Sequence, residues 1–177
     1  MAREEELYCE KLVRTHDRDR YLLALGAGKG GVPALFPLFA FNYEIAKTRE
    51  VVSEPQLGLI RLQWWRDALE SFYSGGAVPK HEVLDALVPV IDQSELPFSW
   101  FEDLLDARVA DLENEQPKTL AALHSYAEST VFPLNRLALK IAGQDEGEDI
   151  LRRVSAACGA VSRPFLPGHI LLALADD

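Results

Sequence analysis

Basic residues are scarce in this chain relative to acidic ones. Lys and Arg together number 18 against 28 Asp and Glu, which gives a formal net charge of −10 at pH 7. A nucleic-acid surface needs clustered Lys and Arg to neutralise phosphates, and only Arg152, Arg153 and Arg163 come near to clustering. The composition therefore argues against a nucleic-acid partner.

Long apolar runs are also missing. No stretch reaches the roughly 18 apolar residues of a membrane-spanning helix, and the first residues, MAREEEL, are acidic where a signal or transit peptide is basic. These absences predict a cytoplasmic protein without a transmembrane segment. The apolar run ILLALA at 170–175 leaves room for peripheral association with an inner membrane.

Cysteine and histidine are too few for a metal or nucleophilic centre of a recognisable kind. Cys9 and Cys158, in a chain without secretory features, are expected to be reduced core thiols and not a disulfide. The four histidines are scattered singly along the chain, which does not match a zinc motif.

Helical periodicity, in contrast, runs along most of the chain. The length of 177 residues, with 48% apolar and 26% charged residues, is that of one ordinary globular domain spanning 1–177. Apolar spacing and capping signals predict helices over about 3–15, 17–25, 33–50, 53–73, 83–91, 98–114, 119–141 and 148–161. No strand pattern or repeat competes with them, so the predicted fold class is all-α.

The stretch from 33 to 73 carries two of the three tryptophans and most of the aromatic residues. Its first half is predicted to be amphipathic, with Glu44, Lys47 and Glu50 on the polar face. Ser53 is expected to cap the second half, which would pack against the first as an antiparallel pair. Trp64 and Trp65 are adjacent, so at most one of them can sit squarely in the core.

Acidic residues on the helix at 98–114 have the spacing of a magnesium site. Glu102, Asp103 and Asp106 lie one helical turn or less apart, and Mg²⁺ takes oxygen ligands of this kind. The same spacing is common on solvated helix faces of an acidic protein, which is the favoured interpretation.

Several segments resemble the squalene/phytoene synthase family. The resemblance is carried by LFPLFAFNYEIAKTREVVSEPQLGLIRLQWWRDALESFY, by DARVADLE, by TLAALHSYAEST and by RPFLPGHIL, which together cover nearly the whole chain. It implies a helical bundle of the isoprenoid (terpenoid) synthase type. Active members of this family join two prenyl diphosphates head to head, with Mg²⁺ held on two aspartate motifs.

The chain departs from this family at both motifs. Aligned on Phe39-Ala40-Phe41, the first motif falls on Ala46, Lys47 and Glu50, so two of the three carboxylates are replaced and one position carries a positive charge. A lysine there would repel Mg²⁺. The second motif is absent between Val161 and Arg163, where the chain is shorter than the family pattern by roughly four helical turns. The predicted domain is therefore truncated or gapped, and incomplete toward Asp177.

Within the family, FNYEIAKTREVVSE followed by GLIRLQWWRDALE most resembles a divergent branch. This branch includes bacterial squalene/phytoene-synthase-like proteins and a mitochondrial complex I assembly factor. The resemblance implies a non-catalytic role without a cofactor, either in binding a lipid-like ligand or in assembling a respiratory complex with a protein partner. The alternative is an active prenyl-diphosphate transferase that holds Mg²⁺ on other acids. The candidate pocket or diphosphate-binding residues are Tyr43, Glu44, Arg49, Glu50, Trp64, Asp106 and Asp111.

Overall fold

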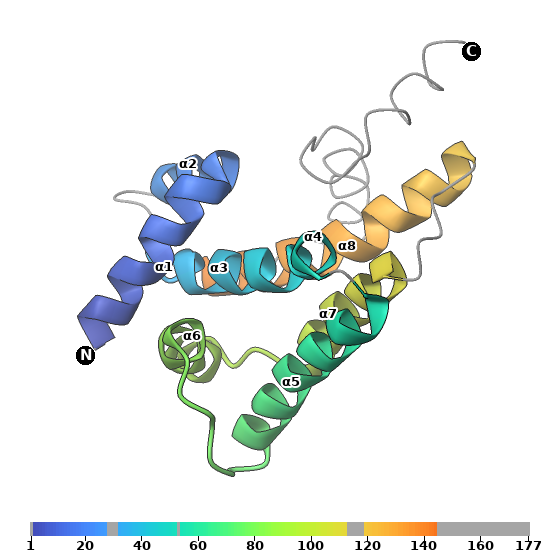
Figure 1. Ribbon diagram of the computed structural model, residues 1–177. Coiled ribbons are helices and arrows are strands. Elements are labelled where there is room, and N and C mark those ends of the chain that lie inside the picture. Colours follow the sequence, from blue (N-terminus) through green and yellow to red (C-terminus); the bar gives the residue numbers. More distant parts are fainter. Residues whose placement is uncertain (1, 28–31, 53, 113–118, 145–177) are drawn as a thin grey trace.

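The protein is all-α throughout the part that the structure describes. This computed structural model describes residues 2–27, 32–52, 54–112 and 119–144, and these ranges contain helices and no strand (Figure 1). The helices are α1 (Ala2–His16), α2 (Arg18–Gly26), α3 (Leu35–Ala46), α4 (Thr48–Val51), α5 (Pro55–Tyr73), α6 (Glu82–Gln93), α7 (Phe98–Leu112) and α8 (Leu120–Ile141). The predicted fold class is confirmed.

Local signals placed several helix ends correctly. Asp17 caps α2, since its side chain accepts a hydrogen bond of 3.1 Å from the backbone N–H of Arg20. Pro55 occupies the first turn of α5, where a missing N–H costs nothing. The residue that precedes it as N-cap is Glu54, without a capping side-chain bond, while Ser53, the predicted cap, lies outside the described residues. The predicted helix at 148–161 and the apolar run at 170–175 also lie outside them.

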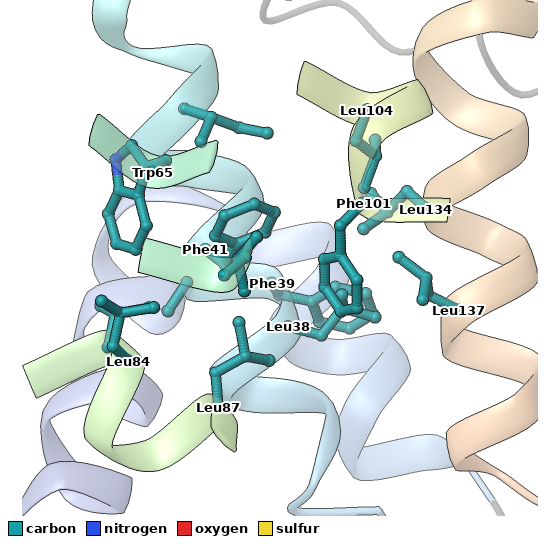
Figure 2. Close-up of a cluster of buried hydrophobic side chains, with 14 of the residues drawn as sticks. Leu38, Phe39, Phe41, Trp65, Leu84, Leu87, Phe101, Leu104, Leu134 and Leu137 are labelled. Carbon is teal, nitrogen blue, oxygen red and sulfur yellow. The ribbon is translucent and has the colours of Figure 1, made fainter. Parts of the chain in front are cut away.

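Helix α3 is the centre of the core, and its predicted amphipathic character is wrong. It packs against α1, α6, α7 and α8, and apart from Tyr43 all its residues from Leu35 to Ala46 are buried. A helix enclosed on every side has no solvent face, so even Glu44 is only 4% exposed. Figure 2 shows side chains of α3, including Phe39 and Phe41, surrounded by leucines and aromatic rings from the neighbouring helices.

Helix α5 packs antiparallel to α7, and not to α3 as predicted. Gly58, near the start of α5, lies against Leu112 at the end of α7. At the opposite end of α5, the Tyr73 hydroxyl donates a hydrogen bond of 2.6 Å to the carbonyl oxygen of Leu96, just before α7. Helix α5 contacts α3 less extensively, although the Trp65 ring meets Phe41 edge to face with centroids 5.3 Å apart.

The tryptophan pair behaves as adjacency on a helix requires. Trp65 is 1% exposed and Trp64 is 38% exposed.

Among the helices in the described ranges, none combines the length and apolarity needed to cross a bilayer.

Candidate functional site

A buried carboxylate with two cationic partners forms the centre of the candidate site. Glu44 lies in the last turn of α3. Lys47 Nζ is 2.5 Å from one of its carboxylate oxygens, and an Arg61 guanidinium nitrogen from α5 is 2.8 Å from the other. Both oxygens of this nearly buried group are therefore engaged by positive charge, which offsets the cost of removing the carboxylate from water.

Tyr43 lies beside this cluster, and its ring contacts His16 and Lys47. The His16 ring, at the end of α1, stacks on the tyrosine ring with centroids 4.5 Å apart. Lys47 Nζ lies 4.9 Å from the same ring centroid. Partial burial, followed by the nearby carboxylates of Glu44 and Glu50, raises the pKa of Tyr43 above its ordinary value. The tyrosine is therefore a neutral hydroxyl at the edge of the cluster.

A second buried polar contact involves Asn42, two residues before the glutamate on the same helix. Arg108 of α7 donates a hydrogen bond of 3.3 Å to the side-chain oxygen of Asn42, and both residues are buried. Sequence reasoning named neither Arg108 nor Arg61 as a site residue. The available signal was the Phe-Asn-x-Glu pattern at 41–44, because a buried Asn and Glu on one helix require partners from other helices.

The acids of α7 do not join this cluster. Arg66 of α5 contacts both Asp106 and Glu102, the latter at 3.5 Å. The Asp103 side chain is exposed on another face of the helix. Glu102 and Asp106 therefore link α7 to α5, and an arginine occupies the position between them.

The remaining candidates lie on α4, α5 and α7. Arg49 and Glu50 are exposed on α4, and the Trp64 ring lies 5.5 Å from the His81 ring. Asp111 belongs to the last turn of α7, and its side chain lies outside the described part. The structure thus brings Tyr43 and Glu44 together at the end of α3, with Glu50 near enough to act on the Tyr43 hydroxyl, and it places Trp64 and Asp106 elsewhere.

The described residues do not fit a magnesium site. Among them, no three Asp, Glu, His or Cys side chains gather closely enough to hold a metal ion. At the first-motif positions, Ala46 offers no ligand, the Lys47 ammonium lies on Glu44, and Glu50 faces solvent. A divalent cation at this point would have to displace an ammonium group from a buried carboxylate.

The class of protein follows from this fold and from comparison with known families. The family described as squalene/phytoene synthase matches residues 13–162, and the chain belongs to this family. The human protein "NADH dehydrogenase (ubiquinone) complex I, assembly factor 6" is 32% identical over 136 residues. That alignment covers 77% of this chain and 40% of the human protein, so the chain spans less than half the length of this relative.

Two solved structures share the fold. Squalene synthase HpnC from Alicyclobacillus acidocaldarius superposes with a TM-score of 0.72 at 23% identity, covering 90% of this chain and 59% of that one. A dehydrosqualene synthase solved with a ligand gives a TM-score of 0.71 at 20% identity, covering 89% and 53%. The predicted isoprenoid-synthase bundle is confirmed as the fold.

Proposed function

We propose that this chain is a non-catalytic member of the squalene/phytoene synthase family that assists the assembly of respiratory complex I through a protein partner. The observation that carries the proposal is the Glu44 cluster, where Lys47 and Arg61 occupy both oxygens of the buried carboxylate. The name of the human relative, a complex I assembly factor, supports the same role. A lipid-like ligand remains a second kind of partner for the same non-catalytic role.

The charge arrangement gives the physical reason for a role without prenyl transfer. A prenyl diphosphate brings several negative charges, and family enzymes neutralise them with Mg²⁺ held on carboxylates. Here the buried carboxylate already has two internal cations, and Asp106 is paired with Arg66. The described part of the chain therefore presents no set of open carboxylates for a metal and its diphosphate.

The alternative is an active head-to-head prenyl-diphosphate transferase that uses Glu44, Glu50, Asp106 and Asp111. The shared fold with a squalene synthase favours it. Incubation of the full chain with farnesyl or geranylgeranyl diphosphate and Mg²⁺ separates the two. We expect no release of diphosphate above background, and release at an enzyme-like rate would refute the non-catalytic proposal.

The assembly role is tested in cells that lack this protein. We expect a loss of assembled complex I and of NADH:ubiquinone oxidoreductase activity, restored by the wild-type chain. Normal complex I in such cells would contradict the proposal. We further infer that the protein works in the cytoplasm, at or near the inner membrane where complex I is built, and fractionation of the same cells tests this location.

A further inference from the structure

The first half of α5 exposes apolar side chains on faces where a surface helix is normally polar. Leu57 is 51% exposed, Leu59 40% and Ile60 64%, although Leu62 on the same turns is buried. Ile60 and the half-open Trp64 are one turn apart, so they share a face. An exposed apolar face of this kind is a feature of surfaces that bind a partner.

A hollow lies along this part of the helix. It has a volume of about 470 Å³, and its lining includes Leu59, Ile60 and Arg66 of α5 and Val109 of α7. All its lining residues except Val109 belong to α5, so the hollow is a groove along α5 at its contact with α7. A groove of this kind accepts the apolar face of a third helix, with side chains spaced three and four residues apart as anchors.

The other end of the groove is acidic. Val109 shares a stripe of α7 with Asp106 and Glu102, and Glu70 is one turn beyond Arg66 on α5. Arg66 is already paired with both α7 acids, and the Asp106 side chain is still 69% exposed. Basic side chains of a partner would therefore find carboxylates next to the apolar floor.

The charges of the two helices decide between a protein and a lipid surface. Together α5 and α7 carry six carboxylates against three guanidiniums. Arg61 and Arg66 are committed to acids and Arg108 is buried. Such a surface repels anionic headgroups and attracts a basic peptide.

We propose that the groove along α5 at its contact with α7, together with the apolar face around Ile60, is the docking site for an amphipathic helix of a partner protein that carries Lys or Arg beside its apolar residues. This inference rests on the proposed binding role and adds the surface and the chemistry of the partner.

The first test uses a synthetic amphipathic helix made of Leu and Lys, labelled for fluorescence anisotropy and titrated with the full chain. Ile60→Ser should weaken its binding by about tenfold, as expected for an anchor position. Leu22→Ser is the matched control, because Leu22 is 54% exposed on α2, which packs on α1 and α3, and it should leave binding unchanged. Equal losses in the two variants would overturn the proposal, and melting curves verify that both variants are folded.

The second test separates electrostatic recognition from nonspecific hydrophobic binding. A peptide of the same pattern with Glu in place of Lys should not bind, and Glu70→Gln should weaken the Leu/Lys peptide and reduce its salt dependence. Equal binding of both peptides would overturn the proposal. Two further results would also overturn the proposal: wild type that sediments with phosphatidylglycerol vesicles, or wild type that self-associates, where Ile60→Ser does not. The groove would then bind a membrane or a second copy of the chain.

Complementation distinguishes a wrong surface from a wrong function. If wild type and Ile60→Ser restore complex I equally, the docking surface is wrong and the assembly role stands. If cells lacking the protein have normal complex I, the assembly role itself is wrong. Restoration by wild type and Leu22→Ser but not by Ile60→Ser is the expected result.

Discussion

At the scale of single residues, the ion pairs of this protein differ in burial and therefore in energetic weight. Glu44 is 5% exposed in its pair with Arg61, whereas the two acids that hold Arg66 are 39% and 69% exposed. Solvent screens the acids of the second set, whereas in the first pair it reaches the arginine, which is 37% exposed, and hardly reaches the carboxylate. Both pairs join an arginine of α5 to an acid of another helix, but their contributions to stability are expected to differ.

Arg61→Met is expected to lower the free energy of unfolding by about 2 kcal/mol, because it leaves a buried carboxylate oxygen without its cation while Lys47 remains. Arg66→Met is the matched control on the same helix and should cost less than about 1 kcal/mol. Urea unfolding of both variants measures the difference. Equal losses would show that burial does not set the strength of these pairs.

The Cys9 thiol links stability to alkaline pH. Burial, followed by the charge of Glu44, raises the pKa of Cys9 to about 12, whereas an unfolded cysteine titrates near about 8.5. The folded chain therefore keeps a proton that the unfolded chain loses, so stability is full below about pH 8.5 and falls as pH rises toward 12.

Between pH 9 and 11 the free energy of unfolding should fall by about 2 kcal/mol through this group. Cys9→Ala should remove that part of the slope, and urea unfolding at the two pH values measures it. An unchanged slope in the variant would show that Cys9 is not the titrating group.

At the scale of elements, the closest approach of α5 and α7 depends on one small residue. A Cβ added at Gly58 would lie 2.7 Å from the nearest carbon of Leu112, which is itself 5% exposed. The glycine is thus needed for space between two antiparallel helices.

Gly58→Leu should push the helices apart and destabilise the protein by about 2 kcal/mol. Gly26→Ala is the control, because a Cβ at Gly26 meets nothing within 4 Å, and it should leave stability unchanged or raise it by less than about 1 kcal/mol. Thermal melts compare the two. A neutral Gly58→Leu would contradict the close packing of α5 on α7.

At the scale of the whole molecule, the chain keeps the family's fold, and in the region predicted to correspond to the first metal motif Glu44 is paired with Lys47 and Arg61. Prenyl transfer needs acids from more than one helix to meet at one point, and the described helices direct their acids to arginines and lysine instead. One restored carboxylate cannot rebuild such an arrangement.

Lys47→Asp should therefore yield no prenyl product from farnesyl diphosphate and Mg²⁺, and it should destabilise the chain by about 2 kcal/mol, since it places a second negative charge beside the buried Glu44. Product analysis and melting curves provide the two measurements. Turnover by this single variant would overturn the interpretation of the motif.

The sequence by itself determined most of the described helices, the fold class and the family of this protein, although the helix predicted over 33–50 is divided into α3 and α4. Helical period, the Asp17 cap and Pro55 at the start of α5 act between residues close along the chain, and the family resemblance rests on segments of the same local kind. Adjacency alone also settled that Trp64 and Trp65 could not both be buried. The single domain over 1–177 and the likeness to bacterial members of the family stay predictions.

Only the tertiary structure decided which faces are buried and which charges meet. The prediction gave α3 a polar face and paired it with α5, because spacing reports amphipathicity but not the number of helices that will enclose a segment. Arg61 lies 17 residues from Glu44, and Arg66 lies 40 residues from Asp106. Contacts at such separations depend on how the helices pack. This packing buries Glu44, which the sequence placed on a polar face, and brings Arg61 to its carboxylate.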